Sequence, residues 1–134
     1  MSVHELNEIA NTGLGGRVGL TVTGYDPDSG ALSASWVLIP NVLDAAGNVH
    51  HGAISSVVET IASIGAGATV NSDQTVVGVS NSTDFVRATQ QSPLVATGFP
   101  ISRDAHQQLW EVRIVGSGDE LVARGTVRLH HISN

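Results

Sequence analysis

The chain has 134 residues and a formal net charge of −6, and arginine supplies all six of its basic residues. This balance argues against a nucleic-acid partner, because no basic stripe is available to displace counterions from a phosphate backbone. The sequence contains no cysteine, which excludes disulfides and thiolate metal sites.

The N-terminal part of the chain predicts a short helix followed by two strands. Residues 1–13 are typical of a polar helix and carry no signal-peptide pattern. Residues 17–24 and 31–39 alternate as strands, with a turn of proline and glycine between them. No apolar run approaches the roughly 20 residues of a membrane span, so we expect a cytoplasmic protein without a membrane partner.

Residues 52–66 follow the period of a helix. Apolar residues recur there every three or four positions, which predicts a helix buried on nearly all sides. One narrow stripe interrupts the apolar surface and consists of Gly52, Ser56, Glu59 and Ser63. Glu59 is the only charged residue between Asp44 and Asp73. Because a carboxylate in such surroundings is costly to desolvate, we expect it to be hydrogen-bonded or functional.

The residues just before this stripe point to a function. His50, His51 and Gly52 stand at the predicted start of the helix, where backbone N–H groups can hold a developing oxyanion. Glu59 can then attack a carbonyl or activate water. No acidic residue lies at ligand spacing from the two histidines, so we expect no metal. The pattern predicts an enzyme.

After residue 75 the chain is predicted to return to strands. These strands cover residues 75–80, 83–88, 93–102, 107–115 and 120–132. The last two are joined by a glycine-containing hairpin loop. We therefore predict an α+β fold, a single domain over residues 1–134 in which an antiparallel sheet of five or six strands wraps around one long central helix.

Three blocks of the sequence, in this order, resemble the hot-dog fold acyl-CoA thioesterases. They are His50-His51-Gly52 with Glu59, the segment VVGVSNSTDFVR at 76–87, and HQQLWEVRI at 106–114. The resemblance is to the branch of the 4-hydroxybenzoyl-CoA, 1,4-dihydroxy-2-naphthoyl-CoA and phenylacetate-pathway (PaaI-like) thioesterases. It implies hydrolysis of an acyl-CoA, with coenzyme A entering only as part of the substrate and no other cofactor. It also implies a homodimer or homotetramer with active sites between subunits, in agreement with a chain that has only 13% charged residues.

The same resemblance implies catalytic roles for five residues. Glu59 matches the catalytic carboxylate, either as nucleophile or as general base toward water. The backbone N–H of His51, next to Gly52, matches the oxyanion site, and His50 matches the motif histidine. Ser63 matches a hydroxyl that orients the attacking group.

Further positions are candidates for substrate contact. Arg87 matches an arginine that meets the phosphates of coenzyme A, and Phe85 stands where one relative has a histidine near the acyl or pantetheine tunnel. Arg103, in a predicted turn, and Ser56, on the helix stripe, are two more candidates. Asp44 stands where the branch has Gln or Asn, and its loop resembles that of a second hot-dog group with a catalytic aspartate. An Asx turn is the alternative role for Asp44.

Two alternative functions remain open at this point. An acyl-thioester hydratase or dehydratase on the same fold would use a histidine with an acid, and Asp44 and His50 resemble that pair loosely. A non-catalytic acyl-CoA-binding module is the second alternative. The sequence leaves open the acyl group, the choice between coenzyme A and a carrier protein, and the choice between covalent and water-mediated attack.

Overall fold

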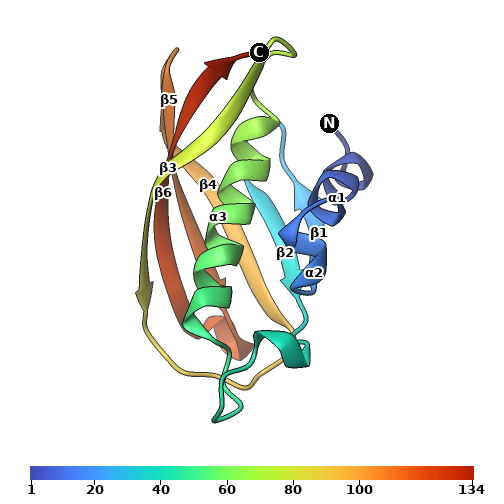
Figure 1. The fold of residues 1–134 in the computed structure, drawn as a ribbon, viewed down its shortest axis with the longest axis vertical. Coiled ribbons are helices and arrows are strands. Elements are labelled where there is room, and N and C mark those ends of the chain that lie inside the picture. Colours follow the sequence, from blue (N-terminus) through green and yellow to red (C-terminus); the bar gives the residue numbers. More distant parts are fainter.

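The computed structural model describes residues 1–134 and consists of one curved sheet with a long helix packed against it (Figure 1). The helices are α1 (Val3–Asn11), α2 (Leu14–Arg17) and α3 (His51–Gly67), with short 3-10 turns at Pro40–Val42 and Ser117–Asp119. The strands are β1 (Leu20–Tyr25), β2 (Leu32–Trp36), β3 (Gln74–Phe85), β4 (Leu94–Arg103), β5 (Gln107–Val115) and β6 (Leu121–Ser133). No helix is long and apolar enough to cross a membrane.

The six strands lie in the order β1-β2-β4-β5-β6-β3, and every neighbouring pair is antiparallel. Helix α3 runs along one face of this sheet, and α1 and α2 lie at the end of the sheet where β1 is found (Figure 1). The predicted α+β architecture, an antiparallel sheet wrapped around one helix, is confirmed. The predicted helix 52–66 differs from α3 by one residue at each end.

The structure corrects the prediction of separate strands at 75–80 and 83–88. Residues 75–80 and 83–85 belong to β3, which is continuous and pairs with β6 over its whole length, whereas residues 86–88 lie beyond its end. A β-bulge lies between Gly78 and Ser80, where the register with β6 shifts by one residue. Because a bulge inserts one extra residue, it interrupts the regular alternation of side chains without ending the strand. The two halves of β3 therefore look like different strands in the sequence.

Close contact between α3 and the sheet depends on small residues. The Trp110 ring of β5 lies against Gly65, and a Cβ at that position would overlap the ring. Trp110 itself is fully buried, and its Nε1 donates a 2.8 Å hydrogen bond to the buried Gln108 side chain. A large aromatic side chain thus fills the space left by a helix glycine, which fixes the position of α3 over β5.

The two edges of the sheet differ. At β1, the side chain of Asn7 in α1 accepts a 2.7 Å hydrogen bond from the Val22 N–H and donates one of 2.8 Å to the Val22 carbonyl. At the other edge, β3 pairs only with β6. Val77 and Val79 of β3 are 39% and 51% exposed. One edge is closed by a helix, and the other presents apolar side chains and backbone to solvent.

Candidate active site

The start of α3 leaves one backbone donor unused. His50 is the N-cap, and its Nδ1 accepts a 2.8 Å hydrogen bond from the Gly52 N–H. The N–H groups of Ala53 and Ile54 both donate to the His50 carbonyl. The N–H of His51 makes no hydrogen bond within the chain. Of the two N–H groups predicted for an oxyanion, the His51 donor is available and the Gly52 donor is bound to the His50 ring.

Glu59 lies on the side of α3 that faces β3. Its side chain is half-buried and takes part in none of the four ion pairs of the protein. Its Oε2 accepts a 3.2 Å hydrogen bond from Asn81 Nδ2. A Cβ at Gly78 would overlap Glu59 Oε1 and would lie 2.9 Å from the carboxyl carbon. The carboxylate therefore packs directly against the backbone of β3, at the bulge.

Asn81 is a site residue that the sequence analysis missed. Its Nδ2 also donates a 3.1 Å hydrogen bond to the Ser55 carbonyl of α3. Its Oδ1 accepts a 2.8 Å hydrogen bond from Thr83 Oγ1. Asn81 lies between the predicted strands 75–80 and 83–88, so no sequence pattern marks it as a site residue. The contact with Glu59 depends on the pairing of α3 with β3, which no local pattern encodes.

The end of β3 meets the start of α3 through a pair of rings. The His51 imidazole and the Phe85 ring are stacked with centroids 4.0 Å apart and planes at 2°. Phe85 remains 41% exposed. The structure thus brings Phe85, a predicted substrate-contacting residue, to the predicted oxyanion donor. Such an exposed aromatic surface suits contact with a flat or apolar group.

The two serines of the α3 stripe differ in their contacts. Ser56 Oγ donates a 2.8 Å hydrogen bond to the Gly52 carbonyl, one turn earlier. Ser63, one turn after Glu59, is half-buried, and its hydroxyl makes no hydrogen bond within the chain. Ser63 is therefore the stripe hydroxyl without a partner in the chain, whereas the Ser56 hydroxyl is bonded to the helix backbone.

Asp44 and Arg87 both have partners of their own. Asp44 Oδ1 accepts hydrogen bonds from the N–H groups of Ala46 (2.9 Å) and Asn48 (3.0 Å), which is Asx-turn geometry. Arg87 Nε lies 3.1 Å from Glu120 Oε1, with both side chains about half exposed. Exposed ion pairs of this kind are weak, so the guanidinium of Arg87 can exchange Glu120 for a stronger anion.

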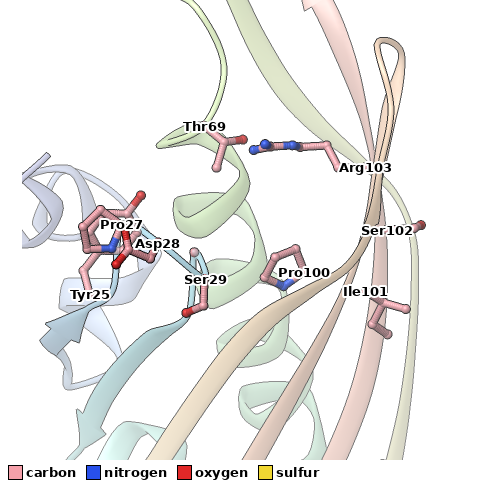
Figure 2. A pocket seen from close by; sticks show the side chains of 10 residues that line it. Tyr25, Pro27, Asp28, Ser29, Thr69, Pro100, Ile101, Ser102 and Arg103 are labelled. Atoms are coloured by element: carbon pink, nitrogen blue, oxygen red, sulfur yellow. The ribbon is translucent and has the colours of Figure 1, made fainter.

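Arg103 lies at the opposite end of α3 from His50. Figure 2 shows its side chain extending from β4 toward Thr69, just beyond the C-terminal end of α3. It lines a hollow of about 280 Å³ together with Tyr25, Ser29 and Pro100. Within one chain the structure therefore does not bring Arg103 to the other candidate residues.

The three hollows of the chain all lie away from Glu59. The first contains Arg103, the second adjoins it around His131, and the third lies beside Arg124 on β6. None of the three is lined by Glu59 or His51. The candidate catalytic groups consequently lie on an open surface between α3 and β3 in the single chain.

A different carboxylate has the strongest charge contacts. Glu111 of β5 is buried, and its two oxygens accept hydrogen bonds from Arg113 (3.0 Å) and Arg124 (2.9 Å). Burial acts to raise the pKa of Glu111, but the hydrogen bonds and charges of Arg124 and Arg113 outweigh it and lower this pKa below its ordinary value. All three residues are held in an ionic cluster, which is the environment that Glu59 lacks.

Comparisons with known proteins agree with this fold. The family model of the Thioesterase superfamily matches residues 46–127 of the chain. A Mycobacterium tuberculosis protein (strain ATCC 25618 / H37Rv) with the name "Putative esterase Rv1847" is 40% identical over 119 residues, covering 87% of this chain and 84% of the relative. The crystal structure of AziG from S. sahachiroi is 38% identical with a TM-score of 0.82, covering 89% of this chain and 95% of that one.

A more distant structure shows the fold alone. It is thioesterase HI1161 from Haemophilus influenzae, with a TM-score of 0.92 at 19% identity over 99% of this chain and 92% of that one. The sheet wrapped around one helix is thus the hot-dog fold of thioesterases. The chain belongs to the Thioesterase superfamily, and this membership supports a hydrolase.

Proposed function

We propose that the protein is an acyl-CoA thioesterase of the branch that includes the aromatic acyl-CoA and PaaI-like enzymes, with Glu59 as its catalytic carboxylate. The observation that carries this proposal is the placement of Glu59: a half-buried carboxylate without an ion-pair partner, held by Asn81 between α3 and β3. Membership of the Thioesterase superfamily supports the hydrolysis of a thioester. The sequence resemblance supports coenzyme A as the thiol.

The proposed reaction uses an oxyanion donor and a base. The His51 N–H polarises the thioester carbonyl and stabilises the negative charge that develops on its oxygen. Glu59 takes a proton from water as the water oxygen bonds to the carbonyl carbon, or attacks that carbon itself to form an anhydride that water then hydrolyses. The C–S bond breaks, and the products are the carboxylic acid and free coenzyme A. Ser63, whose hydroxyl has no partner in the chain, orients the attacking group.

One chain cannot bring both groups to one carbonyl. Glu59 follows His51 by eight residues in the same helix, a rise of about 12 Å at ~1.5 Å per residue. The side chain of Glu59 leans toward the helix N-terminus and closes only part of this gap, whereas both groups must lie within about 3 Å of the reacting atoms. We therefore propose a homodimer, alone or within a homotetramer, in which His51 of one subunit faces Glu59 of its partner.

The open edge of β3 is the surface that fits this dimer. It presents unpaired backbone groups and the exposed side chains of Val77 and Val79 beside Glu59. Edge strands of this kind pair with another strand. In such a dimer the second subunit supplies the wall that the single chain lacks around Glu59.

The remaining candidates take places around the substrate. Phe85, stacked on His51, contacts the acyl group or the pantetheine arm, and an aromatic or medium-size acyl group is favoured. Arg87 releases Glu120 and binds a phosphate of coenzyme A. Asp44 shapes the loop before His50 through its Asx turn, a geometry that offers no support for the proton transfer of a hydratase.

The first test removes the carboxylate. Glu59→Gln keeps the shape of the side chain and is expected to lose at least about a hundredfold in kcat while still binding coenzyme A. The assay uses a panel of aromatic, short-chain and long-chain acyl-CoA thioesters, with Glu8→Gln, an exposed acid of α1, as the matched control. Parent-level hydrolysis by Glu59→Gln would exclude Glu59 as the catalytic group.

The second test asks which subunit supplies which group. His51→Pro removes the free N–H at a position where proline is favoured in helices, and the extended backbone of His50 (ψ 137) tolerates a following proline. His51→Ala keeps the N–H and is the control. Refolding His51→Pro together with Glu59→Gln should restore about a quarter of parent activity, because half of the dimers are mixed and each has one intact site. A mixture as inactive as its components would place both groups in one subunit.

A further inference from the structure

We propose that Asn81 is a positioning residue that aims the Glu59 carboxylate, with Thr83 holding Asn81 in turn. This inference rests on the role proposed for Glu59. Asn81 is the one side chain of the protein that donates a hydrogen bond to this carboxylate. It reaches Glu59 from another element, across the gap between β3 and α3.

The hydrogen bonds determine which way the amide points. The amide nitrogen has two hydrogens and two acceptors within reach, the Ser55 carbonyl at 3.1 Å and Glu59 Oε2 at 3.2 Å. The amide oxygen accepts a hydrogen bond from the Thr83 hydroxyl at 2.8 Å. A reversed amide would direct its oxygen at a carbonyl and a carboxylate, and would lose both of these hydrogen bonds. Asn81 is thus held as a donor to Glu59.

The β3 bulge is what brings Asn81 to this face. Gly78 lies against the Glu59 carboxylate, and in a regular strand only residues an even number of positions away share its face. The register shift between Gly78 and Ser80 changes this pattern, so that Asn81 and then Phe85 also meet α3. Bulges commonly re-aim a side chain next to a functional site. Here one bulge places two parts of β3, a glycine and an amide, on one carboxylate.

The two contacts act on different oxygens of Glu59. Oε1 rests against Gly78, and Oε2 accepts from Asn81. The hydrogen bond from Asn81 limits the rotation of the Glu59 side chain. Asp84, the next acid along β3, lines the hollow beside Arg124 and makes no contact with Glu59.

The experiment compares four variants in the full-length protein. Asn81→Ala removes the donor, Asn81→Asp replaces it with a second carboxylate, and Thr83→Val removes the hydroxyl that holds Asn81. Ser82→Ala, which lies between them and lines the hollow beside Arg124, is the matched control. The readouts are kcat and KM for the best acyl-CoA of the panel, the pH–rate profile and the Tm.

A positioning role predicts a distinct set of results. Asn81→Ala lowers kcat roughly tenfold to a hundredfold with KM within about twofold of the parent, since only the carboxylate is affected. Asn81→Asp moves the acid limb of the pH–rate profile to higher pH by about one unit, because like charges disfavour the ionised form. Thr83→Val has a smaller effect in the same direction. Parent-like kcat in Asn81→Ala, or an unmoved acid limb in Asn81→Asp, would overturn the proposal.

A second readout does not depend on activity. The titration of the Glu59 carboxyl is followed by ¹³C NMR in the parent, Asn81→Asp and Ser82→Ala. Its midpoint is expected at higher pH in Asn81→Asp and unchanged in Ser82→Ala, and equal midpoints in all three proteins would overturn the inference. A parent that hydrolyses no thioester of the panel would instead refute the proposed function, and the NMR comparison would still decide the role of Asn81.

Discussion

The two edge strands of the sheet differ in how far other parts of the chain cover them. β1 is short, and α1 packs along it with Leu6 and Ala10 buried and Asn7 bonded to both backbone groups of Val22. β3 has twelve residues, nearly all of them exposed, and no element covers its outer edge. A sheet edge left bare is liable to pair with another chain. The chain closes one edge and leaves the other available, as the proposed dimer requires.

The proposed catalytic groups lie on the open side. Glu59 contacts Gly78 and Asn81 of β3, and His51 stacks on Phe85 near the end of the same strand. β1 carries no comparable group of candidate residues, and the elements that contact it besides β2 are α1 and α2. The edge that can recruit a second subunit is therefore the edge that carries the proposed chemistry, which links assembly to activity.

The largest expected effect comes from blocking the open edge. A Val77→Asp, Val79→Asp double variant places like charges along a symmetric strand pair and should give a folded monomer with at least about a hundredfold lower activity. Analytical ultracentrifugation measures the mass, and circular dichroism checks the fold. Thr21→Asp, an exposed residue of the closed edge, is the control and should leave both mass and activity unchanged. An active dimer of the double variant would contradict the assignment of β3.

The next prediction compares one glycine at each edge. Gly78→Ala puts a methyl group where the Glu59 carboxylate lies, so we expect the carboxylate to move, with kcat falling roughly tenfold or more and stability by about 1–3 kcal/mol. In Gly24→Ala, the new Cβ meets only Ser33 at 3.7 Å, an ordinary contact, and activity should persist. Enzyme kinetics and urea unfolding measure the two effects. Equal behaviour of the two variants would argue against the close packing of Glu59 on β3.

A smaller effect is expected from opening the closed edge. Asn7→Ala removes two hydrogen bonds and leaves the Val22 N–H and carbonyl without protein partners, which should cost about 2 kcal/mol of unfolding free energy. Hydrogen exchange at the Val22 amide should become faster, and the specific activity of the folded protein should stay at the parent level. Asn11→Ala, on an exposed part of α1, is the control. Loss of activity in Asn7→Ala would show that the two edges are not independent.

The smallest effect is expected at Glu111 of β5, an inner strand of the sheet. Because the pKa of Glu111 is lowered in the folded protein, its contribution to stability is present above its ordinary value of 4.5 and is lost as pH falls through the lowered value. Glu111→Gln should cost at most about 1 kcal/mol at neutral pH and should weaken the acid dependence of Tm below pH 4.5. If the acid dependence of Tm were unchanged in Glu111→Gln, other carboxylates would be responsible for it. Activity should be unaffected, since the cluster does not touch Glu59.

Much of the fold could be predicted because its signals are local. The helix 52–66 was visible in the recurrence of Ile54, Val57 and Ile61, and most strands in their alternation. The stripe that contains Glu59 could also be predicted from helical periodicity alone. The β3 bulge was not predictable in this way, since it depends on pairing with β6 and breaks the alternation that identifies strands. For this reason the sequence pattern predicts two strands where the structure has the single strand β3.

The parts of the site that escaped prediction all depend on contacts between distant segments. Asn81 meets Glu59 only after β3 docks against α3. The Gly52 N–H was expected to be available, but the side chain of His50 turns back to accept it. Arg103 was grouped with the substrate-contacting residues, and its position at the far end of α3 follows from the length of β4. Sequence patterns indicate the candidate groups, and the tertiary structure determines which of them meet.

The N-cap of α3 has a consequence for proton placement. Since Nδ1 of His50 accepts the Gly52 N–H, the neutral imidazole must carry its hydrogen on Nε2. The capping hydrogen bond thereby sets the tautomer, and the Nε2–H of this exposed ring is a donor at the start of the helix. The ring thus serves the helix through one lone pair, and without that acceptor the Gly52 N–H would join the His51 N–H as a donor with no partner in the chain.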